Sequence, residues 1–202
     1  MTETTDPGSV PADHRGPGDA AESTRTGMSH STRSAIEWVA VIVGALVVAL
    51  VVKTFLIQAF YIPSESMVPT LEVGDRVLVN KLSYRTGDID RGDIVVFARP
   101  GGAGSDGIED LIKRVVALPG ETVEGRGGQV FIDGRPLAEP YLPDAVETSV
   151  FPPYVVPEDH VWLMGDNRGA SDDSRRFKAV PTDDIVGRAF VVIWPFTQLG
   201  TL

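Results

Sequence analysis

Hydrophobic residues are distributed along this chain in two different ways, and the first is a single long run. Residues 38–52 read WVAVIVGALVVALVV, fifteen positions without a charge, and the apolar character resumes after Lys53 as far as Ile57. A helix needs about 20 apolar residues to cross about 30 Å of hydrocarbon, and Lys53 can extend its amine to the membrane surface. The pattern therefore predicts a transmembrane helix over residues 35–57.

Two other kinds of segment share this apolar character. A cleaved signal peptide has a shorter apolar core near the N-terminus and a small-residue cleavage site after it, whereas this run begins late and continues as QAFYIP over residues 58–63. A helix that packs on a protein core keeps a polar face, and this run has none. We therefore interpret it as an uncleaved membrane anchor.

The segments on either side of the anchor differ in character. Residues 1–34 are rich in Ser, Thr, Gly, Pro and Asp and have no apolar periodicity, so they cannot bury enough surface to offset the entropy of ordering and are predicted to be a disordered tail. Arg25 and Arg33 precede the anchor, while only Lys53 follows it closely. This asymmetry favours a cytoplasmic N-terminus, with residues 58–202 as an extracytoplasmic domain.

The second pattern occupies that domain and consists of short runs rich in β-branched residues. Turn signals such as Pro119-Gly120 and Asp133-Gly134 separate them, as expected for strands. The strands are predicted at residues 76–80, 93–97, 111–117, 129–132, 160–164 and 189–194. Residues 135–157 carry many prolines and are predicted to be irregular. The fold class is therefore mainly β, with a single N-terminal transmembrane helix before the β-rich domain.

Composition narrows the possible functions. The 202 residues carry a formal charge of -10, which argues against binding to the phosphates of nucleic acid. Cysteine is absent, which excludes disulfides and thiolate metal sites. The three histidines offer little, because His14 and His30 lie in the predicted tail and His160 stands at the start of a predicted strand, where a structural role is favoured over a catalytic triad.

Ser66 is the first candidate for chemistry. It lies in PSESMVPTL (residues 63–71), directly after the anchor, and Pro63 and Pro69 restrict the backbone on either side. Such restriction would fix the Ser66 hydroxyl, and Ser64 could point the same way in an extended segment. The alternative is an ordinary loop that joins a membrane helix to a domain.

Lys113 is the candidate base. In an alternating strand it shares a face with Leu111, Val115 and Ala117, and apolar neighbours lower the pKa of a lysine because burial disfavours its charged form. An ordinary lysine, with a pKa of about 10.4, is almost entirely protonated near neutral pH. The alternative is a lysine on the solvated side of an edge strand.

A polar loop over residues 165–175, GDNRGASDDSR, supplies a third group of side chains. Ser171 offers a hydroxyl that could orient an amine, and Asp173 with Arg175 could form an ion pair. The loop also contains oxygen ligands suitable for calcium, but it lacks the spacing and terminal Glu of an EF-hand. The chain has no H-E-x-x-H zinc motif either.

From about residue 35 to the C-terminus the chain resembles bacterial type I signal peptidase. Four motifs occur in the order that the family has: residues 63–71 resemble the nucleophile box, 91–97 (RGDIVVF) a structural strand, 113–120 (KRVVALPG) the lysine box and 165–175 the last box. The resemblance implies a membrane-anchored serine endopeptidase with a Ser/Lys dyad, which removes signal peptides from exported preproteins after small residues in an Ala-x-Ala pattern.

The resemblance also implies roles for single residues. Ser66 is the nucleophile and Lys113 the general base, Ser64 and the Ser66 N–H form the oxyanion hole, and Ser171, Asp173 and Arg175 support the lysine. The residues implied for substrate pockets are Phe60, Ile62, Met67, Leu71, Val96, Asp110 and Ile112. No cofactor or metal is implied, and the partners are signal peptides, the bilayer of the plasma membrane and the neighbouring secretion translocon, without nucleic acid.

The chain departs from the family pattern at two places. Glu65 stands where a small residue, commonly Gly, is usual, so its side chain must point away from the oxyanion site, and Gly169-Ala170 replaces a common Asp-Asn pair. Two other classes of protein remain as alternatives. One is a self-cleaving repressor-type Ser/Lys protease, which carries a DNA-binding domain and no membrane span; the other is a membrane-anchored β domain that binds a partner without catalysis.

Overall fold

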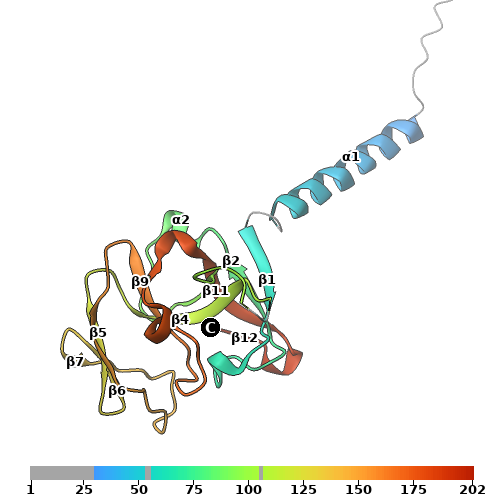
Figure 1. The fold of residues 1–202 in the computed structure, drawn as a ribbon. Coiled ribbons are helices and arrows are strands. Elements are labelled where there is room, and N and C mark those ends of the chain that lie inside the picture. Colours follow the sequence, from blue (N-terminus) through green and yellow to red (C-terminus); the bar gives the residue numbers. More distant parts are fainter. Residues whose placement is uncertain (1–29, 53–55, 105–106) are drawn as a thin grey trace, which may run out of the picture. The chain divides into compact units, whose positions relative to one another are not determined.

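The computed structural model describes residues 30–52, 56–104 and 107–202. Helix α1 (His30–Val51) begins within the predicted tail rather than at residue 35, and residues 1–29 of that tail lie outside the described ranges. Every residue from Ile36 to Val52 is exposed, and Trp38 is 69% exposed (Figure 1). In the described part of the chain, no helix has both the length and the apolarity of a membrane span, so the predicted span is not confirmed.

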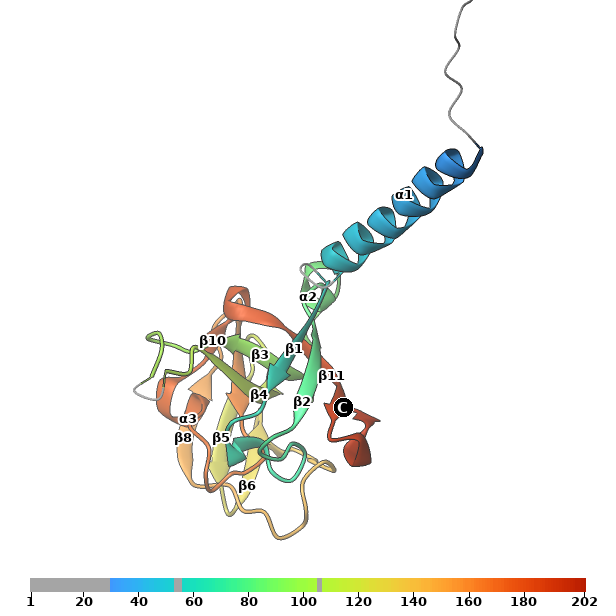
Figure 2. The ribbon, with the colours of Figure 1, turned by 90° about the vertical axis from the view of Figure 1, so that its right-hand side faces the viewer.

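The β-rich domain is built on a sheet of eight strands with the order β1-β2-β11-β3-β4-β9-β10, in which β12 pairs with β11. All of these pairs are antiparallel. The strands are β1 (Ile57–Tyr61), β2 (Arg76–Asn80), β3 (Ile94–Ala98), β4 (Asp110–Ala117), β9 (His160–Met164), β10 (Val180–Pro181), β11 (Ile185–Trp194) and β12 (Gly200–Thr201). Figure 2 shows β1, β2 and β11 side by side.

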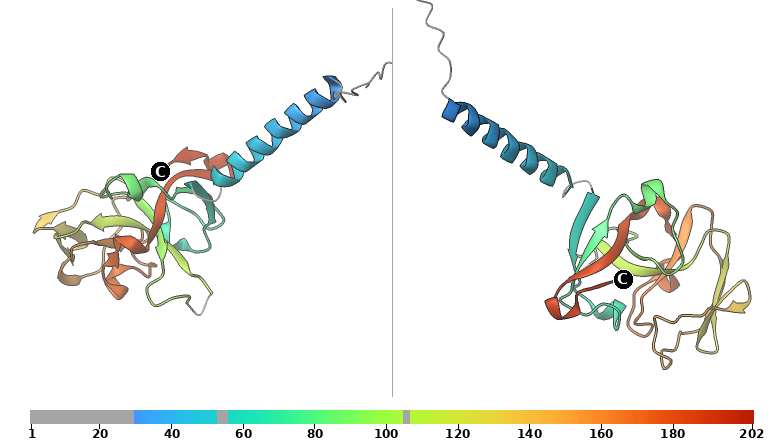
Figure 3. Two further views of the ribbon diagram at one scale, coloured as in Figure 1. Left: turned by 90° about the horizontal axis from the view of Figure 1, so that it is seen from above. Right: turned by 180° about the vertical axis from the view of Figure 1, so that it is seen from behind.

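A second antiparallel sheet has the order β7-β6-β5-β8 and lies at the end of the domain away from β1 (Figures 1 and 3). Its strands are β5 (Thr122–Arg126), β6 (Gln129–Ile132), β7 (Arg135–Pro136) and β8 (Phe151–Val155). The short helical elements of the domain are η2 (Glu65–Met67), α2 (Ser83–Thr86), α3 (Ser174–Phe177), η3 (Thr182–Asp184) and η4 (Phe196–Gln198).

The two sheets share a hydrophobic core. Trp162 of β9 stacks on Phe151 of β8 with ring centroids 5.5 Å apart, and the same cluster contains Val116 of β4 and Val123 of β5. Strand β4 is therefore covered on both faces, and its residues from Ile112 to Ala117 are all buried. This double burial is what places a lysine of β4 inside the protein.

The predicted strands at 76–80, 129–132 and 160–164 are confirmed with the same bounds, and those at 93–97, 111–117 and 189–194 with shifted ends. The prediction that residues 135–157 are irregular is wrong for β8, whose Pro152 and Pro153 are tolerated because β8 is an edge strand and needs ladder bonds on one side only. Ile57, predicted as the last residue of the anchor, is the first of β1.

Candidate active site

Ser66 lies in the short 3₁₀ turn η2, which follows β1. The residue is 7% exposed. Two backbone carbonyls of the turn are held from the loop after β9: the Asn167 N–H donates to the Ser66 carbonyl (3.1 Å) and the Asn167 side-chain amide donates to that of Glu65 (3.1 Å). The Glu65 side chain is exposed, which agrees with the expectation that it points away from the site.

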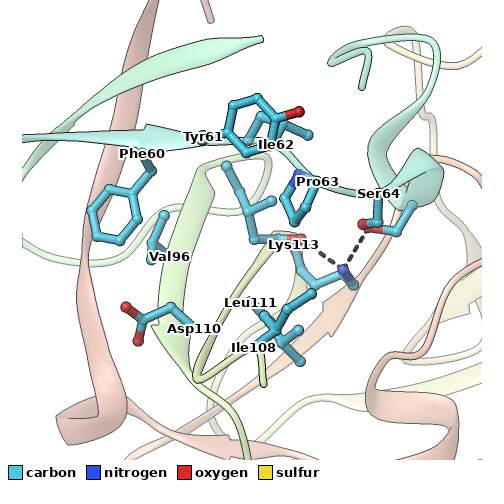
Figure 4. A pocket seen from close by; sticks show the side chains of 12 residues that line it. Phe60, Tyr61, Ile62, Pro63, Ser64, Val96, Ile108, Asp110, Leu111 and Lys113 are labelled. Atoms are coloured by element: carbon cyan, nitrogen blue, oxygen red, sulfur yellow. Dashed lines mark hydrogen bonds between the residues drawn. The ribbon is translucent and has the colours of Figure 1, made fainter. Parts of the chain in front are cut away.

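Lys113 reaches Ser66 from the buried strand β4, where it pairs with Val95 of β3. It is 2% exposed. Its amine donates hydrogen bonds to the Ser66 hydroxyl (2.8 Å) and to the Ile112 carbonyl (2.8 Å) (Figure 4). The two residues that the sequence singled out for chemistry, 47 positions apart, are thus in direct contact.

The surroundings of Lys113 favour its neutral form. Burial lowers the pKa of its amine from 10.5 to about 8, and the nearby Asp173 and Asp172 only partly oppose this shift. With a pKa of about 8, roughly a tenth of the amine is neutral at pH 7, against less than one part in a thousand at the ordinary value. A neutral amine at this distance can accept the serine proton, so the arrangement is suited to activating a hydroxyl nucleophile.

The Ser64 side chain approaches the same hydroxyl. Its Oγ lies 3.3 Å from the Oγ of Ser66, so the Ser64 hydroxyl and the Ser66 backbone N–H belong to one turn beside the reacting oxygen. The assignment of these two groups as donors to a developing oxyanion, which the family resemblance implies, stays a prediction.

Asp173 and Arg175 form the predicted ion pair behind the site. Arg175 donates through Nε and Nη2 to the two carboxylate oxygens (2.8 Å each), and the Gly165 N–H donates to the same group (3.1 Å). Burial opposes ionisation of Asp173, but these donors outweigh it and hold its pKa below the ordinary value. The ionised carboxylate thus fixes the backbone at Gly165.

The Ser171 hydroxyl does not make the predicted contact with Lys113. Its oxygen is buried without a hydrogen bond of ordinary geometry to any described residue, although it lies close enough to Asp173 to lower the pKa of that carboxyl. Gly169 and Ala170, which replace a usual Asp-Asn pair, are both exposed. This departure from the family pattern therefore lies in the exposed part of the loop.

A buried ion pair that sequence reasoning did not assign joins the nucleophile turn, β4 and the loop. Arg114 donates to both carboxylate oxygens of Asp166 (2.9 and 2.6 Å) and to the Gly92 carbonyl (2.8 Å). The Thr70 hydroxyl donates to Asp166 as well. In the sequence, Arg114 is visible only as a charged residue beside Lys113, and Asp166 as one beside Gly165. Nothing local indicates that they pair, because they are 52 positions apart.

A small pocket of about 40 Å³ opens beside Ser66 and Lys113. Of the residues predicted to bind substrate, five line it: Phe60, Ile62, Val96, Asp110 and Ile112. Figure 4 shows Phe60, Val96 and Asp110 together on one side of it. Met67 and Leu71, also predicted to bind substrate, are 0% exposed in the core beneath β1 and β2 and do not line this pocket.

Other kinds of site receive no support from the geometry. His160 lies at the start of β9, where its Nδ1 is 2.9 Å from the Glu158 carbonyl oxygen, and it has no contact with Ser66 among its described partners. Within the described ranges, no cluster of three or more His, Cys, Asp or Glu side chains could hold a metal ion.

Comparison with known proteins decides the family. The family model described as "Signal peptidase, peptidase S26" matches residues 35–194. The chain belongs to this family. As an S26 peptidase it is a serine peptidase.

Named relatives agree with this S26 assignment. A signal peptidase I of Leptolyngbya laminosa is 45% identical over 78% of this chain and 79% of its own length. A probable signal peptidase I-1 of Synechocystis is 43% identical over 78% and 82%. A signal peptidase I of Mycobacterium tuberculosis is 35% identical over 82% and 74%.

Proposed function

We propose that the chain is a membrane-anchored endopeptidase that removes signal peptides from exported preproteins with a Ser66/Lys113 dyad. The observation that carries the proposal is the 2.8 Å contact between the Lys113 amine and the Ser66 hydroxyl, at a lysine that is 2% exposed. The names of the relatives, which are signal peptidases, supply the class of substrate.

The first step is acylation of Ser66. Neutral Lys113 takes the proton of the Ser66 hydroxyl while Oγ attacks the scissile carbonyl carbon. The carbon–nitrogen bond then breaks, and the new amine of the mature protein leaves with the proton that Lys113 received. A water molecule, deprotonated by the same lysine, hydrolyses the ester and releases the signal peptide.

The oxyanion of this reaction is assigned to two donors of the nucleophile turn, the Ser66 N–H and the Ser64 hydroxyl. Removal of one such donor from a peptidase costs roughly 3–4 kcal/mol of transition-state stabilisation. Asp173 and Arg175 are assigned a supporting role. The buried carboxylate of Asp173 holds the Gly165 N–H at 3.1 Å and Arg175 neutralises its charge, which keeps the loop in contact with the turn.

The size of the pocket beside Ser66 supports cleavage after small residues. Its volume of about 40 Å³ suits a methyl group rather than a large side chain, and its walls include Phe60, Ile62 and Ile112. We therefore assign to it one of the two small side chains of an Ala-x-Ala sequence. Met67, the last residue of the turn, and Leu71, which follows it, are assigned to anchoring the turn, because both are fully buried in the core.

Helix α1 and the residues that follow it are proposed as the anchor. The support is the uncharged run of residues 38–52 and the exposure of every residue from Ile36 to Val52, an apolar surface that needs a cover. The N-terminus lies in the cytoplasm under this proposal. The β domain then stands outside the plasma membrane, where preproteins leave the secretion translocon.

The test is cleavage of a synthetic signal-peptide substrate in detergent by wild type, Ser66→Ala, Lys113→Ala and Lys113→Arg. Arginine keeps the charge but does not lose its proton in a protein, so all three variants are expected to lose activity. For the wild type, kcat/KM is expected to rise with pH through about 8, the pKa of Lys113.

His160→Ala is the matched control, because His160 is the one described histidine of the β domain and lies at the start of β9. It should cut like the wild type. A folded Lys113→Arg variant with normal activity would show that the lysine is not the base. A wild type that leaves the peptide intact would favour a membrane-bound domain that binds without catalysis.

A further inference from the structure

The segment Glu139–Tyr141 lies between β7 and β8 of the small sheet and contacts two arginines, Arg114 of β4 and Arg168 of the loop after β9. Neither Glu139 nor Tyr141 is among the described residues that line the pocket beside Ser66. The Tyr141 hydroxyl donates to a Glu139 carboxylate oxygen at 2.6 Å. A hydrogen bond within the segment thus links Glu139 and Tyr141, and neither side chain lines the pocket in which a substrate would bind.

Glu139 holds Arg168 with both carboxylate oxygens. The Nη1 of Arg168 donates to one of them (2.9 Å) and Nη2 to the other. The side chains are 1% exposed for Arg168 and 11% for Glu139. Arg168 also donates to the Gly165 carbonyl (3.1 Å) and the Thr148 hydroxyl (2.7 Å), so its guanidinium ties the loop after β9 to the small sheet. A buried bidentate pair of this kind fixes orientation as well as distance.

Tyr141 holds the second arginine. Its ring lies beneath the guanidinium of Arg114, with Cζ 3.9 Å from the ring centroid, a favourable cation–π contact that also covers the ion. Arg114 neighbours Lys113 on β4 and pairs with Asp166. One three-residue segment thus contacts arginines from both elements that meet at Ser66.

These contacts fix the residues on both sides of Asn167 in the loop. Asp166 is held by Arg114, and Arg168 is held by Glu139. Asn167 in turn holds the carbonyls of Ser66 and Glu65 at 3.1 Å each. We propose that Glu139 and Tyr141 are positioning residues, which set the distance between Ser66 and Lys113 without touching the substrate. The inference rests on the proposed role of these two residues as the catalytic dyad.

The test compares Glu139→Gln, Tyr141→Leu and the double variant with wild type in two assays. The first is cleavage of a signal-peptide substrate, with kcat and KM measured separately. The second is acylation of Ser66 by p-nitrophenyl acetate, followed by mass spectrometry, which needs the dyad but not the peptide pocket. Each single variant is expected to lower kcat and the acylation rate about tenfold at unchanged KM, because small displacements of reacting groups are costly.

Tyr141→Leu removes both the ring under Arg114 and the hydroxyl bonded to Glu139. It leaves Glu139 and Arg168 in place, so the idea remains testable should Glu139→Gln fold poorly. Glu124→Gln is the matched control. Like Glu139, Glu124 pairs with an arginine, in this case Arg126 of the small sheet at 3.4 Å. None of the described contacts of Glu124 reaches the candidate active site. This variant should keep wild-type rates in both assays.

Three results would decide against the inference. Folded variants of Glu139 and Tyr141 with wild-type kcat and acylation rates would show that the segment serves only stability. A rise in KM at unchanged kcat would place the segment in contact with the substrate. Equal losses in Glu124→Gln would mark a general effect of the small sheet. If the wild type is acylated at Ser66 but cuts no signal peptide, the proposed substrate fails, and the acylation rates still judge the positioning role.

Discussion

Gly165 lies where the last loop packs closely against the nucleophile turn. A Cβ at this position would lie 2.2 Å from the Ser171 hydroxyl oxygen and 2.4 Å from the Ser66 carbonyl oxygen. Both distances are far inside van der Waals contact, and the second involves backbone that cannot rotate away. Even the smallest side chain would therefore separate the loop from the turn that carries Ser66.

Gly165→Ala is expected to lower kcat about 100-fold, because displacement of the turn by about 1 Å misaligns Ser66 with Lys113. Steady-state cleavage of the peptide substrate measures the loss, and circular dichroism checks the fold. Gly169→Ala is the control: a Cβ there meets no atom within 4 Å, so its activity should match wild type. Full activity of Gly165→Ala would show that the turn adjusts without cost.

The candidate dyad and the Asp173–Arg175 pair behind it could be predicted from the sequence, but the Arg114–Asp166 and Glu139–Arg168 pairs could not. Prolines around Ser66 and apolar neighbours of Lys113 are local signals, and the structure brings the two side chains to 2.8 Å. Glu139 and Arg168 are 29 positions apart, and nothing near either of them indicates the other. Met67 and Leu71 show a different limit: the family resemblance implied them for substrate pockets, but both are fully buried in the core and neither lines the pocket beside Ser66.

At the scale of elements, β4 explains why a lysine can be a base here. It lies between β3 and β9 in the large sheet and also packs against the small sheet through Val116 and Ala117. The alternating pattern predicted one apolar face, whereas six successive residues of β4 are buried. The sequence could not reveal the second covering layer, because β5 and β8 were not recognised as strands.

Helix α1 is the element that bears on attachment to the membrane. We expect the wild-type chain to remain with lipid vesicles after washing at high pH, and a Val43→Glu/Val47→Glu variant to be released. A charge at the centre of a span costs roughly 2.5–3.5 kcal/mol in insertion experiments, and both valines are exposed on α1. Flotation with the vesicles measures binding.

The control for this experiment places the same charges on the β domain, as Val73→Glu/Val150→Glu, because those valines are also exposed. This variant should stay bound. Retention of both variants would contradict an anchor in α1, and release of the wild type would contradict any anchor in the chain.

At the scale of the whole molecule, the buried amine of Lys113 makes stability depend on pH. Its pKa is about 8 in the folded protein and 10.5 when unperturbed. Between these values the unfolded chain binds more protons, so the contribution of Lys113 to the free energy of unfolding rises with pH from about 8 to about 10.5. Below pH 8 the folded protein carries a cost of about 3 kcal/mol for burying the charge.

Lys113→Met removes that cost, so the variant is expected to be inactive but more stable than wild type at pH 6.5, by about 1–3 kcal/mol. Its advantage should shrink as pH rises from about 8 toward 10.5, because the wild-type amine becomes neutral. Urea unfolding of both proteins at several pH values measures the difference in their free energies of unfolding. Titrations of groups that the two proteins share cancel in this difference. A difference that does not change with pH would contradict the low pKa of Lys113.

The position of β11 has a consequence for the order of events during synthesis. This strand comes near the end of the chain, yet it lies between β2 and β3, two strands from the first half. While a ribosome is still making residues 185–194, β2 and β3 have no common neighbour and the large sheet cannot close. Ser66 and Lys113 are both synthesised long before that point, so an emerging chain carries its reactive groups but acquires the sheet that aligns them only after β11 has been translated.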